Sequence, residues 1–251
     1  MTDTATTAPG ILATHRYMPR LRLDRAAVFA QHRWMAPGLK SVARGHRAMA
    51  SWDEDSVTMA VEAARGLRRA LPSMQLAGVT LASTTLPFAE RLNAGIVAGA
   101  LGLPEALLVR DVGSSPRAAV TELIALLRQN GAPAQLLLAS DRRLAKPASA
   151  QEMLNGDGAA GIVVGQGPTI ATLLASHSVH ADLVHRFRAT GQTYDYGWEE
   201  RWVRDEGYMK IAVPALQQCL VNGQVNAADI AHFAMPSLVS RVDEAVARKL
   251  G

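Results

Sequence analysis

The segment 135–165 constrains the fold most, because it holds two apolar runs on either side of a polar loop. Residues 135–139 read Gln-Leu-Leu-Leu-Ala, and residues 161–165 read Gly-Ile-Val-Val-Gly. Runs of this kind, without polar alternation, are typical of strands that other layers cover on both faces. The segment therefore predicts the interior of a layered α/β domain.

The turn into the second run is rich in glycine. Gly156, Gly158 and Gly161 allow the backbone to pass close to a helix, a ligand or another strand. Asp157 stands between two of them, and its carboxylate can accept hydrogen bonds from neighbouring amides and fix the turn. Two compatible interpretations stay open here. One is a tight turn into a core strand, and the other is a backbone wall beside a substrate channel.

Helices and strands alternate along the first part of the chain. The clearest helix covers 53–69, since Asp53, Glu54 and Asp55 in its first turn and arginines in its last turn complement the helix dipole. We interpret the acidic triplet as capping and not as a metal site. We expect a further helix capped by Asp24 and an irregular segment at 45–52. The other predicted strands are 10–14, 76–82, 106–112 and 169–175, and the other predicted helices are 87–101 and 115–127.

A helix, a strand and a helix follow again near the end, at 207–221, 229–235 and 237–250. The same order occurs in the earlier part of the chain, and such recurrence is the signature of a duplicated unit. Because this order is also common by chance, the residues alone leave duplication open.

Composition excludes several classes of protein. The chain has 251 residues, 49% of them hydrophobic, which is enough for one large domain or two small ones. The net charge of +4 comes from basic residues scattered among acidic ones, which argues against nucleic-acid binding. We find no run of about 18 apolar residues that could span a membrane. The polar residues 1–9 predict a flexible tail and not a signal peptide. A single cysteine, Cys219, excludes an intramolecular disulfide, so we expect a cytoplasmic protein.

Short motifs occur in a fixed order along most of the chain: 10–12 with 17–20, 53–60, 82–88, 139–143 (Ala-Ser-Asp-Arg-Arg) and 156–160 (Gly-Asp-Gly-Ala-Ala). They resemble the thiolase superfamily, and within it the branch of 3-hydroxy-3-methylglutaryl-CoA synthase and ketoacyl synthase III. The resemblance implies two similar halves whose sheets form a five-layer αβαβα sandwich.

On this resemblance we divide the chain into a tail (1–9), a first thiolase-like half (10–176), a connecting or lid segment (177–206) and an incomplete second half (207–251). The second half would end before its remaining strands. Because a sheet without those strands would expose edges and apolar faces, we expect either a partner that supplies the missing layer or a fragment of a longer protein.

The resemblance also implies three catalytic positions. In this branch a cysteine at a helix N-terminus attacks an acyl thioester, while a glutamate and a histidine manage the protons. The matching positions here hold Pro116, Thr84 and Ala234, which argues against cysteine-based Claisen condensation. The nearest substitutes are Ser115, which otherwise would be a helix N-cap, and His232, on the same face of the predicted strand as Ala234.

We expect the substrate channel to be lined by Thr84 and by the turn of Gly156, Asp157 and Gly158. The resemblance implies acyl-CoA as substrate or ligand and no tightly bound cofactor.

Three other features have simpler explanations than a functional site. His177, His180 and His185 lie in one segment, but on a helix His185 would point away from the other two, so we expect no metal site. Cys219 fits a small core residue better than a displaced nucleophile. The aromatic and acidic run 194–202 fits either a lid, a partner-docking loop or ordinary packing.

Two hypotheses for function follow. The first is an acyl-CoA acyltransferase or condensing enzyme that resembles hydroxymethylglutaryl-CoA synthase. The second is a non-catalytic scaffold subunit, in a homo- or hetero-oligomer, that pairs with an active thiolase or an OB-fold zinc-ribbon protein. The acyl group and the identity of a partner stay open.

Overall fold

The structure is a computed structural model that describes residues 8–237, 239 and 241–251. Most of the predicted tail, residues 1–7, lies outside the described residues. The chain divides into two compact units, Met1–Leu173 and Leu174–Gly251, which we call unit 1 and unit 2. The predicted boundaries at 176 and 206 stay predictions.

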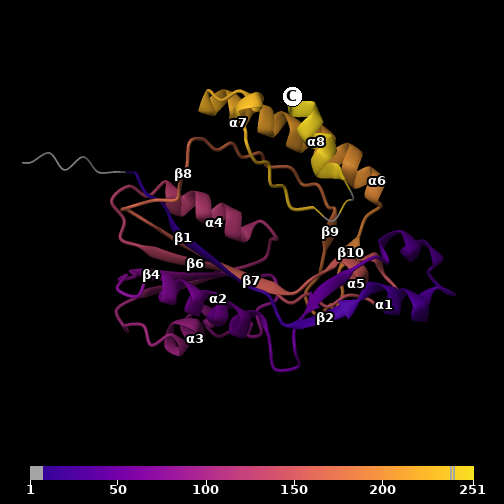
Figure 1. Ribbon diagram of the computed structural model, residues 1–251, viewed down its shortest axis with the longest axis horizontal. Helices are drawn as coiled ribbons and strands as arrows, with labels where there is room; N and C mark the ends of the chain where they lie inside the picture. The colour runs from indigo at the N-terminus through magenta and orange to yellow at the C-terminus, as the bar shows by residue number, and fades with distance from the viewer. Residues whose placement is uncertain (1–7, 238, 240) are drawn as a thin grey trace, which may run out of the picture. The chain divides into compact units, whose positions relative to one another are not determined.

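Unit 1 is built on a six-stranded sheet with the strand order β5-β4-β6-β7-β1-β8 (Figure 1). β4 pairs in parallel with β5 and β6, whereas β7 is antiparallel to both β6 and β1. The strands are β1 (Gly10–Tyr17), β4 (Gly78–Ala82), β5 (Leu108–Val112), β6 (Gln135–Asp141), β7 (Gly158–Gly165) and β8 (Ala171–Thr172). β1, β4, β5 and β6 therefore end at the same edge of the sheet, where β7 begins.

Helices cover both faces of this sheet (Figure 1). α2 (Ser56–Ala70) and α3 (Asn93–Ala100) pack on one face, and α4 (Ala118–Leu127) packs on the other. Side chains of β6 alternate between the two layers: Leu136 and Leu138 join the core with α2, and Leu137 packs with α4. The prediction that the leucine run is a strand buried on both faces is confirmed.

Acidic residues before two helices, which the sequence predicts as caps, form capping hydrogen bonds in the structure. Asp24 caps α1 (Arg25–His32), because its Oδ1 accepts a hydrogen bond from the Ala26 amide at 2.9 Å. Asp55 accepts from the Val57 and Thr58 amides, and the Thr58 hydroxyl accepts from the Asp55 amide, which forms a capping box. The helix predicted at 53–69 therefore begins at Ser56, and the acidic residues before it include its cap.

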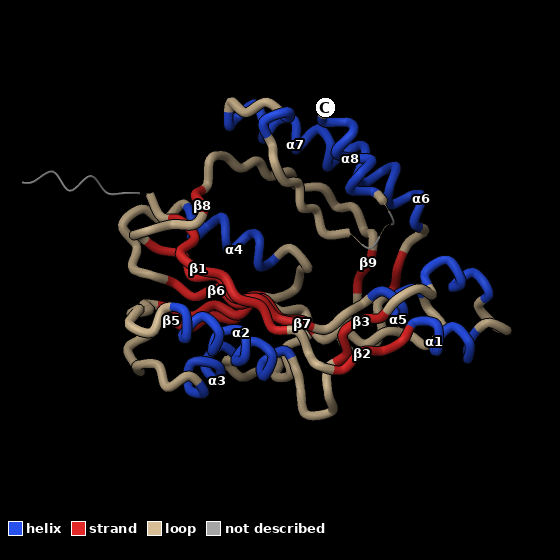
Figure 2. The backbone as a smooth tube through the Cα atoms, viewed as in Figure 1, coloured by secondary structure: helices blue, strands red, loops and turns tan. Residues whose placement is uncertain are grey.

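Two predictions for unit 1 need correction. Residues 45–52 are not irregular throughout, because β3 (His46–Met49) pairs with β2 (Leu21–Asp24) in a small antiparallel sheet (Figure 2). The helix expected from residue 87 begins only at Asn93. Its first amides are held by the Asp111 carboxylate of β5, which accepts from Asn93 N and Ala94 N at 2.7 Å each.

The short elements η1 (Pro37–Val42) and α5 (Ala150–Leu154) complete the unit.

Unit 2 is mainly helical. Its described elements are β9 (Arg186–Phe187), β10 (Tyr196–Gly197), α6 (Glu200–Trp202), the π-helix η2 (Val203–Ala212), α7 (Val213–Gly223), η3 (Ala227–Asp229) and α8 (Val242–Leu250). Its core is formed by Val213, Val242 and Val246. The helix predicted at 207–221 is observed as the end of η2 followed by α7.

The prediction of a strand at 229–235 is wrong. In the described part of unit 2, β9 and β10 pair only with each other, so no neighbouring strand is present to bond this backbone. After η3 the segment is an irregular, mostly exposed stretch that includes His232 and Ala234. The argument that these two side chains share one strand face therefore does not hold.

The two-sided burial of β6 predicts a large difference between two leucines of the sheet. Leu138→Ala should lower the free energy of unfolding by about 2–5 kcal/mol, because the Leu138 side chain of β6 is fully buried in the core shared with α2. Leu108→Ala on β5 is the control, since Leu108 is 58% exposed, and it should change stability by less than about 1 kcal/mol. Urea denaturation followed by circular dichroism measures both, and equal losses would contradict the described packing.

Candidate functional site

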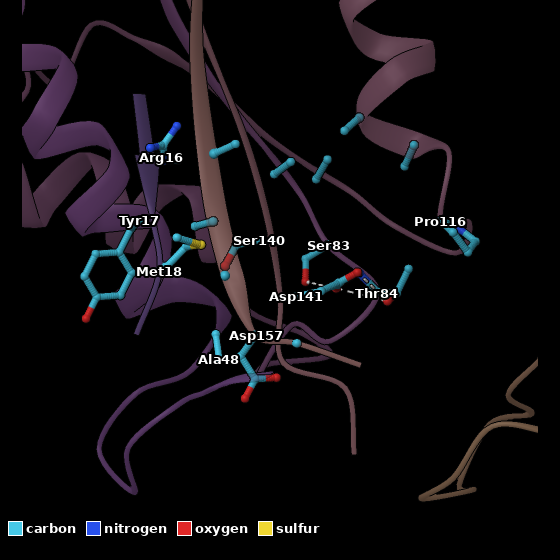
Figure 3. Close-up of a pocket in the computed structure, with 18 of the residues that line it drawn as sticks. Arg16, Tyr17, Met18, Ala48, Ser83, Thr84, Pro116, Ser140, Asp141 and Asp157 are labelled. Carbon is cyan, nitrogen blue, oxygen red and sulfur yellow. Dashed lines mark hydrogen bonds between the residues drawn. The ribbon is translucent and has the colours of Figure 1, made fainter. Parts of the chain in front are cut away.

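A cavity of about 550 Å³ opens in unit 1 at the edge where β1, β4 and β6 end and β7 begins (Figure 3). Five segments of the chain line it together with Ala48: 16–18, 82–84, the start of the α4 region (115, 116, 118 and 119), 139–141 and 156–160. The cavity therefore collects residues from distant parts of the sequence at one end of the sheet.

Every candidate residue predicted in unit 1 lines this cavity. Thr84, Ser115 and Pro116 form part of its wall, and so does the turn 156–158. His232 and Ala234 belong to unit 2, where both are exposed. The structure thus brings together the predicted substrate-binding residues and one of the two predicted catalytic ones, while their roles stay predictions.

The Asp141 carboxylate is the centre of the polar contacts at this edge. It accepts hydrogen bonds from the Thr84 amide at 2.7 Å, from the hydroxyls of Ser83 and Thr85 at 3.1 Å, and from Thr84 Oγ1 at 3.0 Å to each carboxylate oxygen. These contacts join the end of β6 to the loop that follows β4 (Figure 3). One carboxylate therefore fixes the conformation of the whole 83–85 loop.

Two arginines complete the network. Arg143 Nη1 donates a hydrogen bond to Thr84 Oγ1. The Arg142 amide donates to Thr85 Oγ1 at 2.9 Å, and its side chain donates to the Glu54 carbonyl at 2.7 Å. The Thr84 hydroxyl is consequently held between a carboxylate and a guanidinium.

Sequence reasoning missed Asp141 and Arg143 as site residues. Both stand in a polar cluster directly after the leucine run, and 83–85 directly follows another predicted strand. The missing information was that β4 and β6 are parallel neighbours with Ala82 opposite Ala139. That register places Thr84 opposite Asp141 when both chains are extended by two residues.

Asp157 is the second carboxyl group of the cavity wall, and it is buried. Its Oδ2 accepts a hydrogen bond from the Ala50 amide at 2.8 Å, and its own amide donates to the Ala48 carbonyl. Burial raises its pKa above the ordinary 3.8, while the Ala50 hydrogen bond and the charge of Arg47 act in the opposite direction. Asp157 therefore fastens the turn to the distant β3 segment and not to neighbouring amides as expected.

Tyr17 is unsuited to proton transfer near neutral pH. Its hydroxyl donates a hydrogen bond to the Glu54 carboxylate. That hydrogen bond, together with burial and the negative charge of Glu54, raises the pKa of Tyr17 to about 12. The phenol stays protonated and acts as a hydrogen-bond donor.

The local contacts of Ser115 contradict the N-cap interpretation, while its role as nucleophile stays a prediction. α4 begins at Ala118 with Arg117 as N-cap and without a side-chain cap, so Ser115 is not the N-cap. Its Oγ accepts one hydrogen bond, from the Arg117 amide at 3.3 Å. Within the described part of the chain, no carboxylate or imidazole bonds to Ser115 and could take its proton.

Across the described ranges, no group of three or more His, Cys, Asp or Glu side chains is arranged to hold a metal ion. The described helices also include none that is both long and apolar enough to cross a membrane. Cys219 lies on α7 and is half-buried.

Comparisons with known proteins give a coherent set of relatives, although no family model matches the chain. The hydroxymethylglutaryl-CoA synthases of Picrophilus torridus and Aeropyrum pernix are each 28% identical, over 174 and 178 residues. These matches cover 67% and 69% of this chain and 49% of each relative. The enzyme of the same name from Methanosphaera stadtmanae is 26% identical over 222 residues, which is 84% of this chain and 64% of the relative. The matched region thus spans about half the length of the first two relatives.

Solved structures agree in fold. The 3-oxoacyl-(acyl carrier protein) synthase III of Pseudomonas aeruginosa PAO1 superposes with a TM-score of 0.81 at 22% identity, over 97% of this chain and 80% of that chain. A hydroxymethylglutaryl-CoA synthase complexed with CoA gives 0.82 at 17% identity, over 97% and 64%.

The mixed sheet with helices on both faces and a cavity at the strand ends is thus a thiolase-like α/β fold. In sequence and in fold the chain resembles the thiolase superfamily, in the branch of 3-hydroxy-3-methylglutaryl-CoA synthase and ketoacyl synthase III. The resemblance seen in its motifs is confirmed.

The raised pKa of Asp157 predicts how stability changes with pH. Because the folded protein holds this proton more tightly than the unfolded chain, the stability from Asp157 is complete below 3.8 and is lost as pH rises through the folded pKa. Asp157→Asn keeps an acceptor for the Ala50 amide but cannot ionise. Its stability relative to the parent protein should therefore increase as pH rises above 3.8. Urea denaturation at a series of pH values measures this difference.

The matched control is Asp53→Asn. Asp53 is exposed, and a hydrogen bond with Ser51 lowers its pKa, so its stabilising contribution is present above 3.8 and is lost as pH falls. The control variant should therefore show the opposite trend with pH, at small amplitude. A flat or falling difference for Asp157→Asn would contradict the described environment.

Proposed function

We propose that this protein binds acyl-CoA in the 550 Å³ cavity and acts in acyl transfer or in carbon–carbon bond-forming condensation of acyl thioesters. The observation that carries the proposal is the position of the cavity. It lies at the converging strand ends of a fold that a CoA-complexed hydroxymethylglutaryl-CoA synthase shares. CoA would be a substrate or ligand and not a resident cofactor.

The lining of the cavity fits an acyl thioester. Seven alanines give it small apolar walls: Ala48, Ala82, Ala118, Ala119, Ala139, Ala159 and Ala160. The Asp141 network supplies a polar patch at the same site, and the backbone of 156–158 forms one side. Its volume falls within the range of small-molecule sites, which are mostly apolar with a few placed polar groups.

The reactive groups along this wall are oxygens. The lining includes hydroxyls and the carboxylates of Asp141 and Asp157, and among the described lining residues there is no cysteine, histidine or glutamate. Any covalent chemistry of this cavity would therefore use an oxygen nucleophile. From the sequence, Ser115 is the candidate nucleophile and His232 is the candidate substitute for the histidine of the branch.

The lack of cysteine, histidine and glutamate among the described lining residues also supports a second candidate, a non-catalytic scaffold. The family motifs align Pro116 and Thr84 with the nucleophile and the glutamate of the branch, and Ala234 with its histidine. Pro116 and Thr84 both line the cavity. A scaffold would keep acyl-CoA binding without turnover. It would work in an oligomer with an active thiolase or an OB-fold zinc-ribbon protein, in the cytoplasm.

Filling the cavity should weaken binding. Ala119→Phe places a ring into the cavity wall and should raise the dissociation constant for acetyl-CoA and longer acyl-CoAs at least about tenfold, as measured by isothermal titration calorimetry. Ala125→Phe is the matched control, because Ala125 is an exposed residue of the same helix outside the cavity lining. Equal affinities for the two variants would place binding elsewhere, and absence of binding by the parent protein would refute the proposal.

A further inference from the structure

The hydroxyl of Thr84 is the best activated oxygen of the cavity. It donates toward Asp141, whose two carboxylate oxygens both lie 3.0 Å away, and it accepts a hydrogen bond from Arg143. The side chain is half-buried and lines the cavity (Figure 3). Its oxygen therefore has a proton acceptor on one side and a cation on the other.

The other lining hydroxyls lack this combination. Within the described residues, the Ser115 hydroxyl bonds only to the Arg117 amide, and the Ser140 hydroxyl is buried without a partner. Ser83 donates to Asp141, but its oxygen is contacted by Thr85 and by no arginine. Tyr17 is held protonated by Glu54. Thr84 alone among these described side chains is placed between a base and a guanidinium.

The chemistry of such a pair is that of an activated nucleophile. A carboxylate in hydrogen-bond contact can take the hydroxyl proton during attack, and the guanidinium stabilises the negative charge that develops on the oxygen. The three further donors to Asp141 hold the carboxylate in position.

We propose that Thr84 is the acyl acceptor of this cavity and that Asp141 is its base. Thr84 Oγ1 attacks the thioester carbonyl, a carbon–oxygen bond forms and the carbon–sulfur bond breaks. The Thr84 proton passes to Asp141 and then to the departing sulfur, which leaves as the free thiol of CoA. Water can then release the acyl group as a carboxylic acid. This inference rests on the proposed binding of acyl-CoA, and it replaces Ser115 as nucleophile.

Acylation is tested on the full chain with acetyl-CoA as probe. After acid quenching, intact mass reveals a covalent acetyl adduct, and peptide fragmentation locates it. We expect the adduct on Thr84, its loss in Thr84→Val, and its retention in Thr84→Ser. The control Thr121→Val should also retain it, because Thr121 is exposed on α4 and lies outside the cavity lining. Asp141→Asn should slow acylation at least about 100-fold. Circular dichroism of each variant shows whether it is folded.

Acetyl-CoA affinity is measured on the same samples, so that the two proposals can fail separately. Binding without any adduct in the parent protein would overturn the acceptor role of Thr84 and leave acyl-CoA binding intact. An adduct mapped to Ser115 or to another residue would overturn it as well. If the parent protein binds neither acetyl-CoA nor longer acyl-CoAs, both proposals fail.

Discussion

The structure of unit 1 depends on the burial of β6 from four directions. β4 and β7 pair with its two edges, and helices cover both of its faces, so Leu136, Leu137 and Leu138 all lie in the core. Because this strand has no exposed side, its position and register are fixed by packing. Asp141 is the last residue of β6. The packing of the strand therefore also fixes the position of this carboxylate at the edge of the sheet.

The mixed direction of the strands then decides where chemistry can occur. β7 runs against its neighbours, so the glycine-rich turn that precedes it meets the ends of β4 and β6. This junction places two carboxyl groups in different surroundings. Asp141 is surrounded by hydroxyl and amide donors, whereas Asp157 is buried and its pKa is raised by loss of solvent. The first is a hydrogen-bond acceptor within the site, and the second mainly ties the turn to β3.

The sequence predicted those parts of the fold that depend on local pattern. The two buried runs, the Asp24 cap and the acidic start of α2 all follow from neighbouring residues. It also predicted that Thr84 and the turn 156–158 lie at one site, because the family motifs placed them there.

The errors have a common physical origin. Asn93 begins α3 because a carboxylate from a different strand caps it, and β3 forms because β2 lies beside it. Residues 229–235 have a strand-like composition but no pairing partner among the described strands of unit 2. The contact of Asp141 with Thr84 likewise joins residues 57 positions apart and depends on strand order. Local patterns contain no information about such partners.

The register between β4 and β6 has a consequence for how the cavity can vary among descendants of this chain. A strand alternates its side chains, so one residue inserted within β6 would turn the leucines to the wrong layers and move the last carboxylate away from Thr84. Length changes are thus tolerated in the loops beyond the strands but not within β6 itself. Evolution can change this site by substituting side chains and by altering loops, while Asp141 stays in place because the buried strand β6 holds it.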